Sequence, residues 1–578
     1  LTTGFDGEFA LPIAAEHREF TVKAGGEAVP REYQLLSVSV TLAANRIASA
    51  KLVYVDGAAA TGQFPLSDSD LFKPGQPIEI LAGAGRDSTS VFIGTVVRQG
   101  ARVREAAASQ LVVDCRHAAM KLTVTDRSTD YFDQTDSDII DAVLSAAGVG
   151  ADVESTSLQH KQVLQYQSTD WDFILARARA NGQLVWCEGD KLVVRKPALD
   201  GANVCTLQYG ATLLEFEGEI DARLQHPAYK GASWDPAGQE LVEVDGATPS
   251  FSAPGDLSSD DLAGVADQAF DVRHPALPEA ESQAWVDGIA LYHRVDQVSG
   301  RGKCEGIATV KPGVIVELAG LGRRFNGKVL VTGVRHEFSL VQGWKTHVQF
   351  GGVDLEVPRK PVTEGLLPSV SGLQVGIVTS NEDPDGEDRV RIKLPLLGLS
   401  SDGLWARVAS LDAGNDRGFF FRPEIGDEVI VGFMADDPRY PVILGMLNSS
   451  AKPAPLKGSD DNHEKMLKTR SGMTVHFDDD KIVMTLATPA GNSIVLSEDD
   501  KSLTLADQNG NTIKMDSDGI HLESAKAVNL KAGTETKMEA STSFEIKAGS
   551  ELKLEGSASA ELKGGGMAKL SGAMVQIN

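Results

Sequence analysis

The sequence predicts a mainly β protein that is built in three blocks and assembles as a homotrimer. Alternating apolar and polar residues recur through the first block, as expected of strands with one buried face. Residues 363–450 divide into short strand-like segments separated by turns. The C-terminal part repeats first every 19 and then every eight residues. Because eight is a multiple of two, each repeat keeps the same strand face inward.

The first block, residues 1–362, is expected to be rich in strands with a few helices. Asp136 opens a run of capping residues, and Gly148 ends the helix that follows. Thr169 is followed three residues later by Asp172, a variant of the capping box. The segment 245–261 is rich in Ser, Pro, Gly and Asp and predicts a surface loop. Strands are expected at 34–42, 78–81, 91–97 and 329–334, and helices at 136–148, from 169 and at 278–298.

The second block, residues 363–450, is expected to form a small β-barrel of the OB type. Asp383-Pro-Asp-Gly is a strong hairpin signal between two strand-like segments. Five or so strands in so short a segment are typical of this barrel. Residues 451–470 are rich in Pro and Lys at their start and are expected to be a linker. The strands are expected at 373–379, 389–394, 405–410, 418–421, 428–433 and 442–447.

The third block, residues 471–578, carries two repeats in succession. Gly472, Gly491 and Gly510 are spaced 19 residues apart, and each precedes a similar strand-like segment. An apolar residue then recurs every eight residues, with another small or apolar residue two positions before most of them. We predict that these residues form the trimer core of a needle. They are Leu522, Leu530, Met538, Ile546, Leu554, Leu562 and Leu570.

The eight-residue repeat demands stacking between chains. Each repeat is expected to be a short strand plus a turn, with bends at Gly533, Gly549, Gly565 and Gly572. One repeat exposes too few apolar side chains to bury anything alone. It is also too short for one coil of a single-chain β-helix, which needs roughly 18 residues or more. Three chains that share each coil satisfy both conditions, which predicts a triple-stranded β-helix or prism.

Charges in the needle support this arrangement. The residue after each repeat position alternates in sign, so that stacked neighbours carry opposite charges, and such a ladder opposes slippage. From residue 523 onward the chain has seven Lys and seven Glu and neither Asp nor Arg. A disordered tail would not keep its apolar phase over seven repeats. The alternating residues are Glu523, Lys531, Glu539, Lys547, Glu555 and Lys563.

Composition and motifs give no sign of an enzyme. The formal net charge of −26 argues against charge-driven binding of nucleic acid or anionic membranes. The four cysteines are far apart and the histidines do not cluster, so we expect no metal site and no cofactor. Asp383 and its neighbours lack the remaining spacing of a calcium loop. No GxSxG, Walker or HExxH motif is present, and we expect no catalytic residues.

A barrel of the OB type followed by a triple-stranded prism resembles the VgrG-type spike proteins of contractile injection systems. These proteins are similar to the hub and needle proteins of contractile phage tails fused into one chain. The resemblance covers nearly the whole chain. Its motifs are Asp388-Arg-Val-Arg-Ile-Lys-Leu-Pro, Leu404-Trp-Ala-Arg-Val-Ala, Gly418-Phe-Phe-Phe-Arg-Pro-Glu-Ile-Gly-Asp-Glu-Val, Asp437-Pro-Arg-Tyr-Pro-Val-Ile-Leu-Gly, Asp170-Trp-Asp-Phe, Cys304-Glu-Gly, Lys311-Pro-Gly and Arg324-Phe-Asn-Gly-Lys.

The resemblance implies a hub of two β-barrels over residues 1–362 that trimerises to match a hexameric inner-tube protein. It also implies baseplate partners, effector cargo, contact with a target membrane on firing, and assembly in a bacterial cytoplasm. A PAAR-type tip protein is expected at the needle end, on Val575, Gln576, Ile577 and Asn578. The compact length and phage-like hub favour an extracellular or cell-associated, virion-like particle over type VI secretion. A phage tail-spike adhesin or fibre is the alternative.

Overall fold

The structure is a computed structural model that describes residues 19–83, 88–105, 107–198, 200–249, 253–353, 366–398 and 401–577. The chain forms two compact units, residues 1–448 and 449–578, which are treated separately below. The predicted mainly β class is confirmed. The expected boundary at residue 362 and the middle of the expected loop at 245–261 fall outside the described residues.

A 13-stranded sheet dominates the first unit. Its hydrogen-bonded order is β14-β18-β21-β20-β3-β4-β7-β6-β5-β1-β2, with β19 pairing both β20 and β13. Two hydrophobic cores lie along it, one around Leu52 and one around Val331. The pairing of β3 with β20 joins the two halves into one sheet. The strands are β1 Glu19–Ala24, β2 Glu27–Ala28, β3 Leu35–Ala43, β4 Ser49–Val55, β5 Pro77–Gly83, β6 Thr89–Arg102, β7 Gln110–Arg116, β13 Asn203–Gln208, β14 Leu213–Ile220, β18 Val298–Glu305, β19 Ile315–Ala319, β20 Gly327–Ser339 and β21 Gly343–Phe350.

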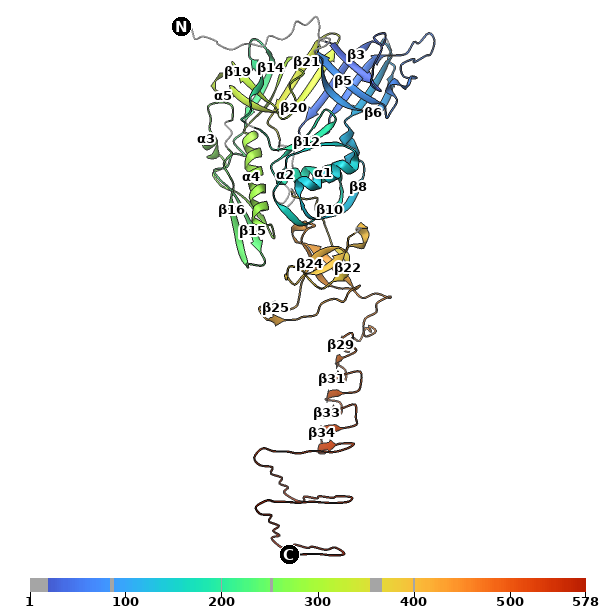
Figure 1. The fold of residues 1–578 in the computed structure, drawn as a ribbon, viewed down its shortest axis with the longest axis vertical. Coiled ribbons are helices and arrows are strands. Elements are labelled where there is room, and N and C mark those ends of the chain that lie inside the picture. Colours follow the sequence, from blue (N-terminus) through green and yellow to red (C-terminus); the bar gives the residue numbers. More distant parts are fainter. Residues whose placement is uncertain are drawn as a thin grey trace. The chain divides into compact units, whose positions relative to one another are not determined.

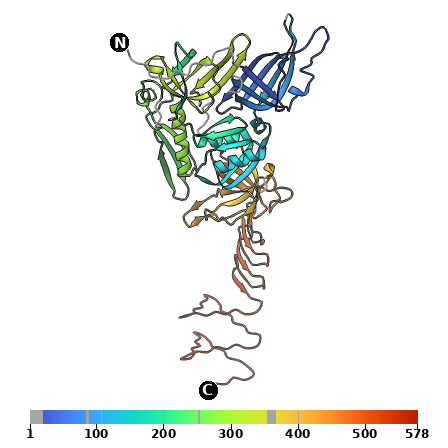
Figure 2. The same ribbon diagram turned by 45° about the horizontal axis from the view of Figure 1, so that its top comes forward.

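The helices lie between these strands in sequence, together with three small sheets. Thr135 caps α1 in a capping box with Asp138, and Gly148 ends the helix in the left-handed conformation. Helix α4 packs on the hairpin of β15 and β16 (Figure 2). No described helix is both long and apolar enough to cross a membrane. The bounds are α1 Asp136–Ala147, α2 Asp170–Ala180, α3 Ser259–Ala263, α4 Glu279–Val295, α5 Gly322–Phe325, β8 Asp126–Thr135, β9 Gly150–Val153, β10 Gln159–Thr169, β11 Leu184–Glu188, β12 Lys191–Arg195, β15 Tyr229–Asp235, β16 Glu240–Asp245 and β17 Phe270–His274.

The predicted OB barrel is present as a closed barrel in the order β22-β23-β24-β28-β27. The predicted strand at 418–421 is wrong. Only Arg417–Gly418 (β26) is a strand there, and it pairs with Ala413–Gly414 (β25) outside the barrel. The three Phe residues that follow have no ladder partner and are exposed. Figure 1 shows β25 apart from the barrel strands β22 and β24. The barrel strands are β22 Gln374–Ser380, β23 Val390–Lys393, β24 Leu404–Val408, β27 Glu428–Phe433 and β28 Pro441–Met446.

The second unit begins with a seven-stranded antiparallel meander in sequence order. One 19-residue repeat corresponds to two strands and their two turns. Strand β29 lies within the segment expected to be a linker and pairs with β30, so the sheet starts before residue 471. The strands are β29 Glu464–Lys468, β30 Thr474–Asp478, β31 Val483–Ala487, β32 Ser493–Ser497, β33 Ser502–Ala506, β34 Thr512–Asp516 and β35 Gly519–Glu523.

Candidate self-assembly surface

One face of the seven-stranded sheet is covered by two columns of apolar side chains. Directly paired residues share a face, and residues two apart along a strand share it as well. Register pairs such as Leu486 with Ile494 therefore extend across the whole sheet. The first column is Leu467, Val475, Leu486, Ile494, Leu505, Ile513 and Leu522, and the second is Phe477, Met484, Leu496, Leu503, Met515 and Ile520.

The opposite face of the same strands is mostly polar. His476, Thr485, Thr504 and Lys514 occupy it at the positions between the apolar pairs. A sheet with one apolar and one polar face needs a covering layer on the apolar side. The described residues of the second unit supply none, because Met515 remains 40% and Leu522 52% exposed. An exposed apolar surface of this extent marks an interaction site.

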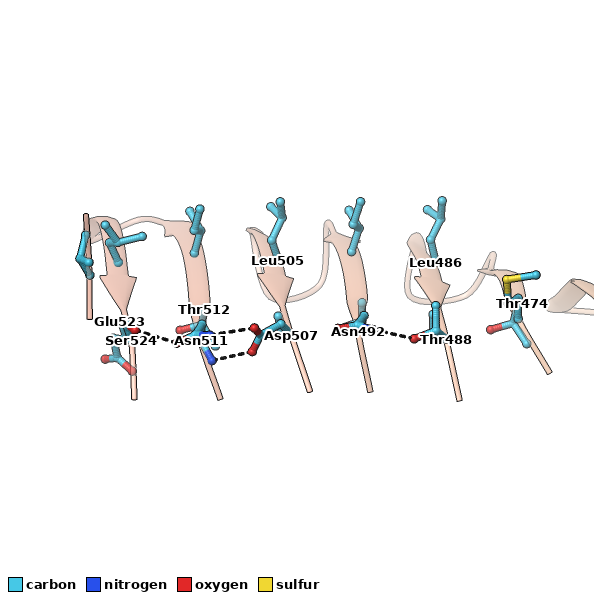
Figure 3. Close-up of a pocket in the computed structure, with 18 of the residues that line it drawn as sticks. Thr474, Leu486, Thr488, Asn492, Leu505, Asp507, Asn511, Thr512, Glu523 and Ser524 are labelled. Atoms are coloured by element: carbon cyan, nitrogen blue, oxygen red, sulfur yellow. Dashed lines mark hydrogen bonds between the residues drawn. The ribbon is translucent and has the colours of Figure 1, made fainter. Parts of the chain in front are cut away.

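Apart from Leu467, the first apolar column lines a groove of about 800 Å³. Figure 3 shows Leu486 and Leu505 pointing to the same side, with the polar residues Asn492, Asp507 and Asn511 at the strand ends. The groove runs along the sheet across successive strands. Its shape and apolar lining fit an extended apolar surface better than a small polar ligand.

The turns of the 19-residue repeat are fixed by glycine and by side-chain hydrogen bonds. Gly472, Gly491 and Gly510 have φ of +85°, +102° and +86°, a region that favours glycine. Asp507 accepts hydrogen bonds from the backbone N–H of Asn511 and from its side-chain amide, at 2.9 and 2.7 Å. These bonds lower the pKa of Asp507 to about 2, so the carboxylate is ionised at neutral pH. The strand register is therefore set by the turns.

The eight-residue repeats, in contrast, form no helix or strand between residues 524 and 577. Bends nevertheless begin at residues 525, 533, 541, 549, 557, 565 and 573, at intervals of eight. Glycine occupies three of these positions, Gly533, Gly549 and Gly565, as expected, whereas Gly572 lies one residue before the last bend. A strand is defined by its hydrogen-bonded neighbour, and these short extended segments have no such neighbour among the residues that the structure describes.

The predicted core residues of the needle are exposed in the single chain. Leu522 lies in β35, paired with Ile513, while the other six lie in the strand-free segment and keep between 54% and 88% of their exposure. Val575 and Ile577 are also exposed, and Gln576 lies between them. Asn578 falls outside the described residues. The assignment of these positions to a trimer core and to tip contact stays a prediction.

The apolar columns upstream of Leu522 were not predicted. Each glycine of the 19-residue repeat is followed by a pair of apolar residues two positions apart, a pattern typical of a strand with one buried face. Val475 with Phe477, and Ile494 with Leu496, are examples of this signal. The assembly surface therefore begins near Leu467, well before the eight-residue repeat.

A second feature missed from the sequence is a buried cluster of charges in the first unit. Arg177 of α2 binds Asp136 of α1 at 2.6 Å and Glu281 of α4 at 3.0 Å. Arg439, in the barrel segment, binds Glu281 at 2.5 Å and Asp437 at 2.7 Å. His160 lies 3.1 Å from Asp136 and His274 lies 3.4 Å from Asp437.

Paired charges keep this cluster ionised despite its burial. Desolvation acts to raise the pKa of Asp136, but Arg177 and the hydrogen bonds of the cluster hold that pKa far below its usual range. Arg439 has the same effect on the pKa of Asp437. Among the described residues, no group of three or more His, Cys, Asp or Glu side chains is arranged so that it could hold a metal ion.

Three segments of the chain match known protein families. Residues 14–339 match the Alg8 N-terminal domain. Residues 374–447 match the type VI secretion system/phage-baseplate injector OB domain. Residues 481–578 match the phage baseplate V C-terminal trimerisation domain. These matches cover the first block, the barrel and most of the second unit in that order.

The chain is also similar to spike proteins of Pseudomonas aeruginosa. It is 34% identical over 125 residues to the type VI secretion system spike protein VgrG4b. This match covers 20% of this chain and 15% of that protein. It is 24% identical over 440 residues to VgrG1c, which covers 69% of this chain and 58% of that protein. The matched segments thus span less than two thirds of either relative. The Francisella PdpA–VgrG complex has a similar fold, with a TM-score of 0.50, 10% identity and coverage of 88% of this chain and 80% of that one.

Proposed function

The chain belongs to the family of the Alg8 N-terminal domain and to the VgrG spike proteins, and from this premise we propose that it is the central spike of a phage-tail-like contractile injection machine. The order of the three matched segments supports a hub, an injector barrel and a trimeric needle in one chain. The injector match of the barrel favours this role over a tail-spike adhesin or fibre.

The observation that carries the proposal is the uncovered apolar face of the sheet from β29 to β35. Three copies that turn this face inward form a three-sided prism, in which each sheet covers the apolar columns of the other two. The eight-residue repeats continue the same axis, with Leu530 to Leu570 in the shared core and strands paired between chains. The C-terminal trimerisation match supports three as the number of copies.

The proposed role is mechanical. Contraction of a sheath drives the needle through a target envelope, and the needle must neither buckle nor unfold. Chains that share one core and one hydrogen-bond network unfold only together, which gives the high barrier of kinetic stability. This role needs no catalytic residue and no cofactor, so we propose a spike that acts without turnover of its own.

The proposed partners follow from the two ends of the spike. The hub joins baseplate proteins and a hexameric inner tube, and a PAAR-type tip protein sits on Val575, Gln576, Ile577 and Asn578. Effector cargo travels with the tip. We place the protein in an extracellular or cell-associated particle that is assembled in a bacterial cytoplasm.

Paired aspartate substitutions test the proposed core. Ile546→Asp with Leu554→Asp places six carboxylates in the shared interior of a trimer and should abolish SDS-resistant trimers. The matched control, Lys547→Asp with Glu555→Asp, changes the next residues, which face outward in the proposed prism, and should leave the trimers intact. Loss of the SDS-resistant trimers in both variants, or in neither variant, would show that the shared core is assigned to the wrong residues.

A further inference from the structure

An exposed aromatic arm leaves the barrel between β24 and β27. We define the arm as residues 409–421, every one of which is exposed. Its apolar side chains include Leu411, 91% exposed, and Phe420, 79% exposed, with Phe419 and Phe421 each more than half exposed. Figure 1 shows β25 of this arm set apart from the barrel strands β22 and β24. Four large apolar side chains held in water on one arm indicate a contact with another molecule.

The arm has a defined conformation. Arg417 forms an ion pair with Asp412 at 2.6 Å, and the backbone N–H of Phe419 donates to the carbonyl of Asp412 at 2.9 Å. At the base, the guanidinium of Arg422 lies 5.2 Å from the centre of the Phe420 ring and also binds Asp388. The aromatic side chains are thus presented in advance, which lowers the entropy cost of binding.

The outer wall of the same barrel carries a second uncovered apolar surface. The inward side chains of this wall, such as Val431 and Ile443, are fully buried. The outer patch consists of Leu373, Val375, Leu444 and Met446, which are between 37% and 57% exposed. A Cβ at Gly432 would lie 3.3 Å from Leu444 and 3.6 Å from Leu373, so both leucines pack over this glycine on the outer wall of the barrel.

We propose that in the trimer the aromatic arm of each copy packs on the outer patch of the next copy. A ring with threefold symmetry requires two different, complementary surfaces on every subunit, because its contacts are head-to-tail. The arm and the outer patch are two such surfaces on one domain, the first projecting from the barrel and the second lying on its outer wall. The inference rests on the proposed trimer and names the contact that closes the barrels into a ring.

The small size of this contact is compatible with the assembly. Four side chains on each surface would not hold free subunits together at ordinary concentrations. In a trimer joined along the needle, however, each barrel is tethered to the shared sheet by the short segment between Met446 and Glu464. Tethering raises the effective concentration of each surface to roughly the millimolar range, which makes a weak contact sufficient.

Cysteine cross-linking of the full chain tests the contact. Phe420→Cys combined with Leu444→Cys should convert most chains to a disulfide-linked trimer on a boiled, non-reducing gel. Each single substitution should leave the chain at the mass of one subunit. The matched control, Phe420→Cys with Leu396→Cys, uses a barrel leucine that is 78% exposed and lies outside the outer patch, and it should give no covalent trimer.

The mass in solution separates the two proposals. The double-cysteine variant could be a trimer by light scattering and yet show no disulfide between chains, or a disulfide within one chain only. Either result overturns the contact between arm and outer patch, while the needle proposal stands. A covalent dimer from Phe420→Cys alone also overturns it, because the arms would then meet one another. A monomer in solution for the unsubstituted chain overturns the trimer and, with it, this inference.

Discussion

Arg439 donates a hydrogen bond from Nη1 to Oε1 of Glu281 at 2.5 Å, and both side chains are 3% exposed. The two residues are far apart in sequence, one in the barrel segment and one in helix α4. Arg177 binds the same Oε1 at 3.0 Å, so Glu281 sits between two guanidinium groups. The contact joins the barrel to the first block through buried charges.

Removing Arg439 should destabilise the first unit strongly. Arg439→Met leaves Asp437 and Glu281 as buried carboxylates that have lost a partner, and breaking such a pair costs roughly 3–5 kcal/mol. Arg301→Met is the control, because Arg301 pairs with Glu217 in solvent, where an ion pair is worth about 1 kcal/mol or less. Urea unfolding followed by tryptophan fluorescence measures both. Similar midpoints for the two variants would contradict the role of the cluster.

Acid should weaken the first unit through His336. Burial lowers the pKa of His336 from 6.5 to about 4. The unfolded chain therefore takes up a proton at this residue between pH 6.5 and 4, while the folded chain does not. The free energy of unfolding should fall across this window by roughly 3 kcal/mol and level off below it. Between pH 6.5 and 4.5, the free energy of unfolding should change clearly less in His336→Gln than in the unsubstituted chain. An unchanged difference between the two pH values would assign the effect to other groups.

Polar substitutions on the apolar face of the needle sheet should destabilise the trimer, whereas substitutions on its polar face should not. Met515→Asn removes an apolar side chain from the proposed prism interior and should cost roughly 2–5 kcal/mol per chain in the trimer. Lys514→Asn changes the neighbouring residue on the opposite face and should have little effect. Thermal dissociation of the trimer, followed by light scattering, compares the two. A larger effect at Lys514 would mean that the faces are reversed.

The turn at Gly510 should tolerate no side chain. Its φ of +86° is strained for any residue with a Cβ, so Gly510→Ala should cost about 1–2 kcal/mol per chain. Gly458 has no such φ and no atom within 4 Å of an added Cβ, and Gly458→Ala serves as the control. The melting temperatures of the two variants give the comparison. Equal melting temperatures would show that this turn does not limit the stability of the needle.

Local signals predicted much of the fold. The caps of α1 and α2 and the hairpin at Asp383 depend on residues within one turn of each other, and the structure contains all three. The prediction of a strand at 418–421 was wrong because the apolar run of this segment resembles a strand. Only Gly418 of this segment has a ladder partner, Ala413, and Phe420 is exposed. In sequence, an apolar run whose side chains contact another chain looks the same as an apolar run that forms a strand.

Long-range contacts could not be predicted in the same way. Asp136, Glu281 and Arg439 meet only after three separate segments have packed together, and charged residues at such distances in sequence carry no pairing signal. The continuity of the large sheet through β3 and β20 depends on the same kind of contact. The apolar columns of the needle sheet were readable from alternation within each strand, but their use as an interface required the uncovered face to be seen.

Negative-stain electron microscopy of the purified full chain tests the central claim most directly. A trimeric spike should appear as particles with one straight needle attached to a ring, with end views of threefold symmetry. Single-chain particles, needles without threefold symmetry, or rings without a needle would contradict it.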